Sequence, residues 1–350
     1  MVKLSVLDLA NIGEGFTPAD ALSNALDLAQ HAEAAGYRRF WLAEHHNLAG
    51  IASAATAVCI CHVAGGTKNI RVGAGRIMLP NHSPMIIAEQ FGTLATLFPE
   101  RIDLGLGRAP GTDQRTWMAL RRGPEASESF PQDVLELQAL LGPPREDQAI
   151  HAIPGEDTNV PLWVLGSSLY GAQLAAMLGL PYAFASHFAP QALMQAIAVY
   201  RERFEPSAQL DKPYVMVGCN VIVADTEKEA KRLFTSPQQN VTRMVRGTRG
   251  LLPPPINDIE EFWSPMEKAH ASSMLGCSFY GSAETIKGKL DTLIEETNAD
   301  ELMVAAAVWD HKARVRSFEL LAGAMNESTT FGFRRPEPVY SGAHENPAIL

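Results

Sequence analysis

Eight short apolar runs alternate with helical patterns along the chain, and this alternation restricts the fold more than any other feature. Most runs are apolar on both faces, which is typical of parallel strands that are covered by helices. Strands that alternate with helices form right-handed βαβ units, and eight such units favour a closed barrel over an open sheet. We therefore predict an α/β fold, a (β/α)8 TIM barrel. The predicted strands are 4–9, 38–46, 70–79, 102–108, 161–168, 181–188, 215–223 and 301–309.

The segments between these runs carry helix start and stop signals. Thr17 and Ser83 each precede a proline, which suits a cap followed by the first helical position. Gly36 and Gly179 follow predicted helix ends, where a left-handed residue terminates the helix. The predicted helices are 18–35, 52–64, 84–97, 170–178, 192–204, 227–234, 283–296 and 312–325.

Two long stretches rich in proline and glycine exceed a minimal barrel. They are residues 110–160, after the fourth strand, and 235–281, after the seventh. We predict one domain over 1–330 that carries these two insertions, followed by an irregular tail over 331–350. Residues 250–255 (GLLPPP) make the second insertion loop-like, and such loops at a barrel mouth can act as lids or as inert excursions.

Composition excludes several classes of protein. Hydrophobic residues make up 46% of the chain and charged residues 19%, which is typical of a globular protein. The 29 basic and 39 acidic residues give a net charge of −10 without a basic run, so we expect no nucleic acid or membrane surface as a partner. The first residues lack the pattern of a signal peptide, and the 4 cysteines are too few for a disulfide framework, so we expect a cytoplasmic protein with reduced thiols.

Polar residues cluster where the predicted strands end, and barrels of this kind carry their sites at that end. Five of the 10 histidines fall at these positions, which favours a shared pocket. The strand-end residues are Asp8, Asn11, Glu44, His45, His46, Arg76, Asn81, His82, Arg108, Ser167, Ser168, Ser186, His187, Asn220, Asp310 and His311.

Among them, Ser167 and Ser168 precede a predicted helix and so offer free backbone N–H groups to an anion. Arg108 ends the neighbouring strand and carries a planar fork that suits phosphate oxygens. An ordinary helix cap is the alternative for the serines. Residues 105–111 (GLGRAPG) lack the spacing of a dinucleotide-binding fingerprint, so we expect no nicotinamide site of that type.

Glu44, His45 and His46 end the second strand. Adjacent histidines on a strand point to opposite faces, and no third ligand stands at a recognised spacing, so we expect no metal site. A single inward imidazole beside a carboxylate suits general acid–base chemistry. A hydrogen-bonded histidine pair at the barrel rim remains the alternative.

Taken together, these motifs resemble the bacterial luciferase-like superfamily of flavin-dependent monooxygenases over residues 4–325. The resemblance implies that Arg108, Gly166, Ser167 and Ser168 bind the phosphate of FMN. It also implies that His45 is catalytic, with Glu44 as a candidate to orient it. The matching segments are 41–47 (WLAEHHN), 72–84 (VGAGRIMLPNHSP), 101–111 (RIDLGLGRAPG), 165–171 (LGSSLYG) and 178–181 (LGLP).

The chain departs from the family pattern at two places. Gly75 and Arg76 stand where the family often has a non-prolyl cis peptide beside the flavin ring, but Arg76 replaces a small residue. Its guanidinium either stabilises the anionic reduced flavin or obstructs the ring site. Gly171 stands where luciferases have a hydroxyl residue, which implies fewer phosphate contacts.

The resemblance thus implies an FMN-dependent, two-component monooxygenase that takes reduced flavin from a separate reductase and acts with O2 on a small, partly apolar substrate. We expect His82, His187 and Trp309 to line the substrate pocket. An F420-dependent hydride-transfer enzyme, a flavin-binding protein without turnover and a metal-dependent barrel hydrolase are the alternatives. The family commonly forms dimers, and the small residues of 52–59 suit a homodimer interface or packing within one barrel.

Overall fold

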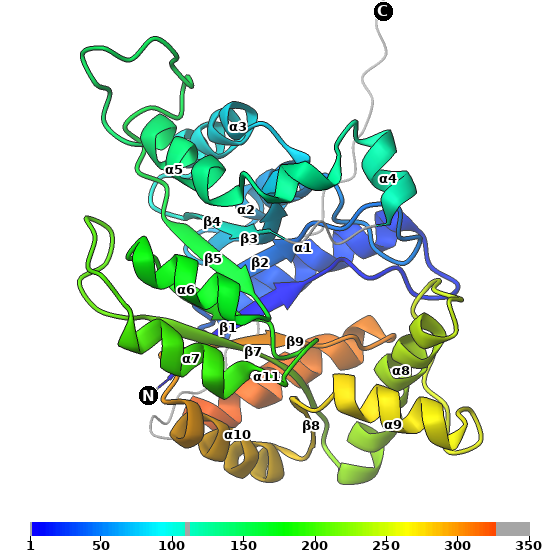
Figure 1. Cartoon of the computed structure of the whole chain (residues 1–350). Helices are drawn as coiled ribbons and strands as arrows, with labels where there is room; N and C mark the ends of the chain where they lie inside the picture. The colour runs from blue at the N-terminus through cyan, green and yellow to red at the C-terminus, as the bar shows by residue number, and fades with distance from the viewer. Residues whose placement is uncertain (1, 109–112, 327–350) are drawn as a thin grey trace, which may run out of the picture.

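The computed structural model describes residues 2–108 and 113–326, and its strands close into a parallel barrel. Each strand pairs with the next, and the β6–β7, β7–β9 and β9–β1 pairings complete the ring (Figure 1). The TIM barrel predicted from the sequence is confirmed. The barrel strands are β1 (Lys3–Asp8), β2 (Arg39–Ala43), β3 (Arg71–Met78), β4 (Ile102–Gly107), β5 (Leu162–Gly166), β6 (Tyr182–Phe184), β7 (Val215–Val223) and β9 (Glu301–Ala305).

Helices surround this ring, and most begin where the sequence predicts. The side chain of Thr17 accepts a hydrogen bond from the backbone N–H of Asp20 in a capping box, with Pro18 in the first turn. Gly36 and Gly179 have φ values of +84° and +62°, as their place after helix ends requires. The outer helices are α1 (Pro18–Ala34), α2 (Thr56–Gly65), α3 (Pro84–Leu97), α5 (Phe130–Leu141), α6 (Leu169–Met177), α7 (Leu193–Glu202), α8 (Glu227–Val245), α10 (Ala283–Thr297) and α11 (His311–Asn326).

The first long stretch contains more regular structure than its composition indicates. Besides α4 (Gln114–Ala119) and the short 3-10 helix η2 (Pro124–Ser127), it holds α5, which packs against α3 on the outside of the barrel. Pro131 lies in the first turn of α5, where a proline costs no backbone hydrogen bond.

The second long stretch is also largely ordered. Helix α8 continues to Val245 and is followed by α9 (Pro265–Met274) and by β8 (Ser278–Gly281), a short strand that pairs with the end of β7 outside the ring. Between α8 and α9, Leu252 donates its N–H to the carbonyl of Ile12 (2.9 Å) and accepts from the N–H of Glu14 (2.8 Å). This segment is thus hydrogen-bonded to the loop after β1. The predicted tail, 331–350, lies outside the described residues.

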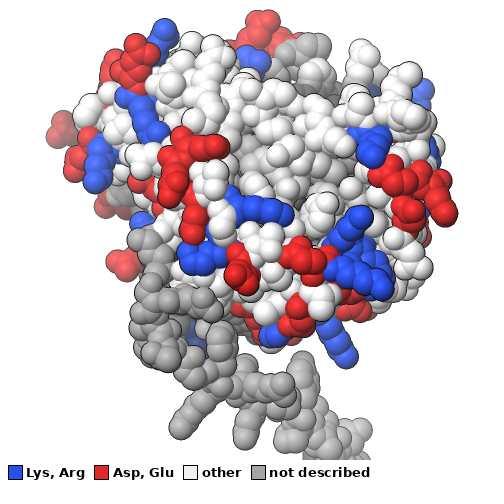
Figure 2. Space-filling model, turned by 90° about the horizontal axis from the view of Figure 1, so that it is seen from below, with Lys and Arg blue, Asp and Glu red and all other residues white. Residues whose placement is uncertain are grey.

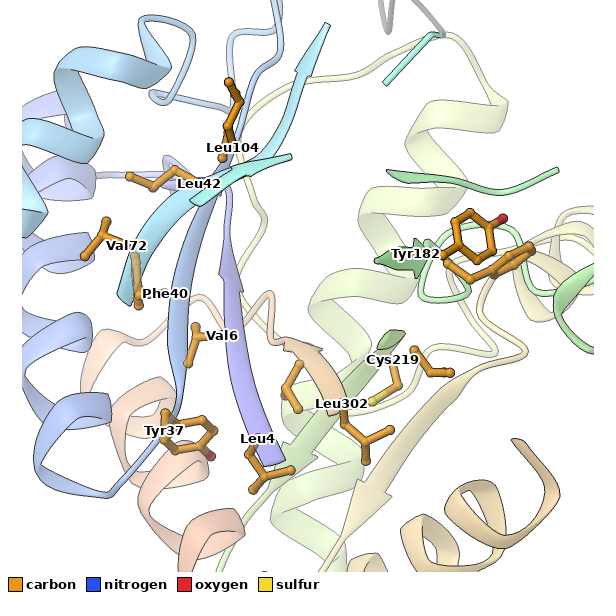
Figure 3. Packing of buried hydrophobic residues seen from close by; sticks show 14 of the residues in the cluster. Leu4, Val6, Tyr37, Phe40, Leu42, Val72, Leu104, Tyr182, Cys219 and Leu302 are labelled. Carbon is orange, nitrogen blue, oxygen red and sulfur yellow. The ribbon is translucent and has the colours of Figure 1, made fainter. Parts of the chain in front are cut away.

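Two apolar clusters hold the barrel together. The larger cluster fills the space between the strands and the helices, as Figure 3 shows for residues including Phe40, Val72 and Leu302. The smaller cluster lies inside the ring and includes Trp41 and Trp163, whose rings meet edge to face at 5.1 Å.

A charged network lies below these rings, at the amino end of the barrel. Asp103 is fully buried and accepts hydrogen bonds from Arg39 (2.7 Å), Arg71 (2.6 Å) and Trp41 (3.2 Å). Arg39 also donates to Glu301 at 3.0 Å. The charges of this end are therefore paired with one another.

The exterior carries both signs of charge. On the face seen in Figure 2, basic and acidic side chains are interspersed. Among the described residues, no helix is both long and apolar enough to cross a membrane.

Candidate active site

The carboxyl ends of β2 and β3 lie side by side and bring Glu44 and Arg76 together. Ala43 pairs with Arg76, and the N–H of Glu44 donates to the Arg76 carbonyl at 3.2 Å. The pairing of β3 with β4 shifts register between Ala74 and Ile77, so β3 is irregular around Gly75 and Arg76. A Cβ at Gly75 would overlap the end of the Leu7 side chain inside the barrel, so a larger residue there would have to displace that side chain.

The non-prolyl cis peptide that the family often has at this position is not present between Gly75 and Arg76. Among the described residues, the one cis bond joins Ile153 to Pro154. The linkage at Gly75 is therefore trans, and the register shift accommodates the irregular backbone there instead.

Glu44 is a buried acceptor for three donors. Its Oε1 accepts from Nε2 of His46 (2.6 Å) and of His82 (2.9 Å), and its Oε2 accepts from the N–H of Met78 (3.0 Å). Burial alone would raise the pKa of Glu44, but the bonds from His46 and His82 lower it to about 2. The hydrogen bond between His46 and Glu44 also raises the pKa of His46. Glu44 therefore stays a carboxylate at neutral pH.

The expectation that Glu44 orients His45 is wrong. Consecutive residues of an extended chain point to opposite faces, so Glu44 shares a face with His46, two positions along, while His45 points away. The carboxylate consequently holds His46 and His82. His82, which we expected to line the substrate pocket, is thus anchored by Glu44.

The same three side chains form a group that could hold a metal ion. One ligand atom from each of Glu44, His46 and His82 lies within 4.8 Å of the others. Sequence reasoning missed this group because it considered only the adjacent histidines, whereas His82 comes from the turn after β3. Two imidazoles and a carboxylate are ligands that Zn²⁺ accepts.

Three further strand-end residues are Arg76, His45 and His187. A Cβ at Gly107 would overlap Cγ and Cδ of Arg76, and a Cβ at Gly218 would lie 2.5 Å from Nδ1 of His187, so both side chains pack across glycines. Nδ1 of His45 and of His187 is buried without a hydrogen-bond partner among the described residues. Burial and the positive charge of Arg76 lower the pKa of both histidines to about 4, so both are neutral near pH 7.

Arg108 and the start of α6 lie together. The guanidinium of Arg108 stacks on the ring of Tyr170, with Cζ 4.1 Å from the ring centroid. Ser168 occupies the N-cap position, but its hydroxyl makes no capping hydrogen bond. Gly166 and Gly171 face each other here, and a Cβ at Gly166 would make only an ordinary contact of 3.9 Å with the Cα of Gly171.

This arrangement fits a phosphate group. Backbone N–H groups at the start of α6, the unused hydroxyl of Ser168 and the neighbouring guanidinium of Arg108 are the donors that phosphate oxygens require. Ser167 lies in the turn between β5 and α6 and can add a further hydroxyl.

Trp309 contacts a different part of the barrel mouth. Its Nε1 donates to the carbonyl of Glu14 (3.0 Å), and its ring lies 5.2 Å from that of Phe16. It lines a small cavity together with His311 and Arg314. Trp309 follows β9, which pairs with β1. The segments after these two strands therefore lie side by side, so Trp309 meets Glu14 and Phe16.

The strand-end residues Asp8 and His311 meet through a residue that sequence reasoning missed. Arg314, one helical turn after His311, donates to Asp8 (3.2 Å) and approaches Nδ1 of His311 at 3.3 Å. His311 also hydrogen-bonds Asp27 at 2.7 Å. His311 and Arg314 are three positions apart on one helix face, and this spacing in the sequence could have identified Arg314.

The chain thus forms a closed parallel barrel with polar side chains at its strand ends and backbone donors at the start of α6. The family model for luciferase-like monooxygenases matches residues 2–301, and the chain belongs to this family. An Escherichia coli (strain K12) protein named luciferase-like monooxygenase is 52% identical over 93% of this chain and 98% of its own length. The N-acetyl-S-alkylcysteine monooxygenase of Bacillus subtilis (strain 168) is 36% identical over 67% of this chain and 72% of its own.

Solved structures share the fold. The crystal structure of apo-MsnO8 has a TM-score of 0.86 and 35% identity, over 93% of this chain and 98% of that one. Two others resemble the fold alone. The oxygenating constituent of 3,6-diketocamphane monooxygenase in complex with FMN has a TM-score of 0.68 at 18% identity, covering 92% and 96% of the two chains. An F420-dependent secondary alcohol dehydrogenase has a TM-score of 0.67 at 16% identity, covering 93% and 99%.

Proposed function

We propose that the protein is an FMN-dependent monooxygenase that receives reduced flavin from a separate reductase and acts with O2 on a small, partly apolar substrate. The observation that carries this proposal is the stacking of Arg108 on Tyr170 at the start of α6, since it concentrates donors for one phosphate group. Membership of the luciferase-like monooxygenase family and the FMN complex of a protein with the same fold support it.

We also propose a cytoplasmic homodimer that pairs through α2, where Val58 is 70% exposed.

FMN bound in reduced form supplies the electrons for the activation of O2. Arg108, Ser167, Ser168 and the backbone at Gly166 would hold its phosphate. We assign proton transfer to His45, whose imidazole is neutral near pH 7 and so can accept a proton, although a pKa of about 4 makes it a weak base at that pH. Glu44 keeps His46 and His82 in fixed orientations at the rim of the same site.

FMN titration of the protein and of Arg108→Gln tests this proposal. Loss of charge-assisted hydrogen bonds, worth about 1.5–3 kcal/mol each, should weaken FMN binding about 10-fold or more. Riboflavin, which lacks the phosphate, should bind the parent and the variant equally. Arg203→Gln, at an exposed site at the end of α7, serves as the matched control. A variant that still prefers FMN to riboflavin as strongly as the parent does would refute the assignment.

F420 is the main alternative cofactor, because a protein of the same fold uses it. Mass spectrometry of the retained cofactor and oxygen uptake after photoreduction separate the two. Uptake of oxygen without product from any substrate would indicate a flavin-binding protein without turnover. Loss of activity to a chelator, in a colourless protein, would instead favour a hydrolase built on Glu44, His46 and His82.

A further inference from the structure

Three oxidisable aromatic side chains form a continuous stack inside the barrel. The ring centroids of Trp41 and Trp163 are 5.1 Å apart, and those of Trp163 and Tyr214 are 5.6 Å apart. Both pairs meet edge to face, which brings the rings into direct contact. Trp41 and Trp163 belong to the apolar cluster inside the ring of strands, and Tyr214 packs against it. An electron can therefore pass from ring to ring without crossing a gap.

The two ends of the stack lie in different surroundings. Trp41 is fully buried, and a Cβ at Gly75 would lie 3.5 Å from its Cβ, so it is next to the irregular end of β3. Tyr214 precedes β7 and is partly exposed, and Nζ of the exposed Lys3 donates to its hydroxyl at 3.3 Å. The stack thus leads from the strand end beside Arg76 to the surface at the amino end of the barrel.

Charged neighbours determine which tryptophan can hold a positive charge. A tryptophan that has lost one electron is a cation, and Trp41 donates its Nε1–H to the carboxylate of Asp103 at 3.2 Å, which stabilises a cation there. The guanidinium of Arg39 lies over the ring of Trp163, 4.7 Å from its centroid, and disfavours a cation. Trp163 can therefore pass the charge on but does not retain it.

Tyr214 can lose a proton together with an electron. Its hydroxyl donates to Oε2 of Glu301 at 2.8 Å, so a carboxylate is in place to accept the proton. Nζ of Lys3 lies 5.1 Å from the centre of the tyrosine ring and disfavours a positive charge on it. The oxidised state therefore ends at Tyr214 as a neutral radical.

We propose that Trp41, Trp163 and Tyr214 form an electron-transfer path between the amino-end surface and the site, an inference that rests on the flavin chemistry proposed above. A one-electron oxidant at the site, such as photoexcited FMN or an oxyl radical from incomplete reduction of O2, takes one electron from Trp41. Trp163 replaces that electron and Tyr214 replaces the next, while the phenol proton passes to Glu301. A thiol in solution then returns one electron and one proton to Tyr214 and is itself oxidised to a thiyl radical.

The path protects methionines in the same cluster. Met216 and Met303 are buried inside the ring of strands together with Trp41 and Trp163. Oxidation of a buried methionine to the sulfoxide places a polar group in an apolar core. Transfer of the oxidised state to a surface tyrosine, where a thiol can reduce it, removes this hazard.

Laser photoionisation of tryptophan in the flavin-free protein tests the path without a cofactor. Transient absorption follows the tryptophan radical and the delayed rise of a tyrosyl radical, which we expect at a rate independent of protein concentration. The delayed rise should be lost in Tyr214→Phe and in Trp163→Phe. Tyr280→Phe is the matched control, because Tyr280 stacks on Phe234 outside the ring, and it should keep the rise. A parent without the delayed rise would overturn the proposal, as would equal rises in Tyr214→Phe and Tyr280→Phe.

Flash excitation of bound FMN, in the absence of O2, tests whether the path begins at the site. We expect the parent to give one-electron-reduced FMN and a tyrosyl radical, identified by electron paramagnetic resonance, and Trp41→Phe to give no tyrosyl radical at unchanged FMN affinity. A tyrosyl radical of parent-like yield in Trp41→Phe would overturn the proposal. So would its absence from the FMN-loaded parent, which leaves the cofactor assignment intact. Failure to bind FMN contradicts the proposed function instead, and the flavin-free experiment then decides on the path alone.

Discussion

Two consecutive histidines in this protein have pKa values that are shifted in opposite directions. His45 is buried beside Arg76, and its pKa falls to about 4, whereas the pKa of His46 rises because it donates to Glu44. The cause is strand geometry, which sends neighbouring side chains into different surroundings. A titration of the whole protein therefore reports these two rings in separate pH ranges.

The low pKa values of His45 and His187 predict a pH-dependent stability. Unfolding restores a pKa near 6.5, so the unfolded chain binds more protons between pH 6.5 and 4, and the free energy of unfolding falls as pH drops through that window. We expect a loss of about 2 kcal/mol for each histidine between pH 7 and pH 4.5, with Arg76, Arg249 and Glu44 as the charges that face them.

Urea denaturation at these two pH values measures the loss. His45→Asn and His187→Asn should each flatten the dependence, while the exposed His270→Asn should leave it unchanged. A parent-like slope in the double variant would contradict the assignment.

The candidate residues could be chosen from the sequence, because the carboxyl ends of barrel strands converge. His45, His187 and Arg76 were selected on that ground, and the positive charge of Arg76 lowers the pKa of both histidines. The hydrogen bonds that Glu44 accepts from His46 and His82 were not predictable. The bond from His46 depends on which face each residue after β2 presents, and the bond from His82 depends on the turn after β3.

At the level of elements, the start of α6 has room for a side chain at Gly171. Gly171 is the third residue of this helix, and a Cβ there would meet Tyr182 at 3.4 Å and the Cα of Gly166 at 3.7 Å, which are ordinary contacts. A serine therefore fits without displacing a neighbour.

Gly171→Ser is expected to tighten FMN binding about 3- to 10-fold, because its hydroxyl adds a donor beside the phosphate, worth about 1 kcal/mol. Gly171→Ala supplies the matched control, since it adds the Cβ without the donor and should not gain affinity. Flavin fluorescence titration of both variants measures the difference. Equal affinities for serine and alanine would show that no phosphate oxygen lies within reach.

The elements that the sequence did not predict share a physical cause. Helix α5 has a proline in its first turn, and α8 contains Pro237, so the prolines concealed helices that tertiary packing stabilises. Strand β8 has four residues and pairs with β7 outside the barrel, and such a short run has no periodicity to detect.

For the molecule as a whole, stability and chemistry are concentrated at opposite ends of the barrel. The amino end holds the network of Asp103, Arg39, Arg71 and Glu301, and the carboxyl end holds the proposed site. The barrel itself was predictable, because eight apolar runs leave few alternatives. The network was not, because its charged residues are separated by up to 262 positions in sequence.

Asp103→Asn should therefore destabilise the protein without altering the site. Removing this fully buried charge leaves Arg39 and Arg71 without their shared carboxylate, and breaking such a pair typically costs about 3–5 kcal/mol. Asp225→Asn, which removes an exposed pair with Arg316, should cost less than about 1 kcal/mol. Denaturant unfolding gives both values, and FMN affinity of folded Asp103→Asn should stay within twofold of the parent. A comparable effect of the two variants would contradict this division of roles.

The backbone bonds between Leu252 and residues Ile12 and Glu14 tie together segments that are far apart in sequence. A chimera that imports the insertion of a relative without its matching first loop would leave one amide and one carbonyl of Leu252 without their acceptor and donor. These two segments therefore constitute a single exchangeable module, and recombination of barrel mouths within the family should succeed when both are transferred at once.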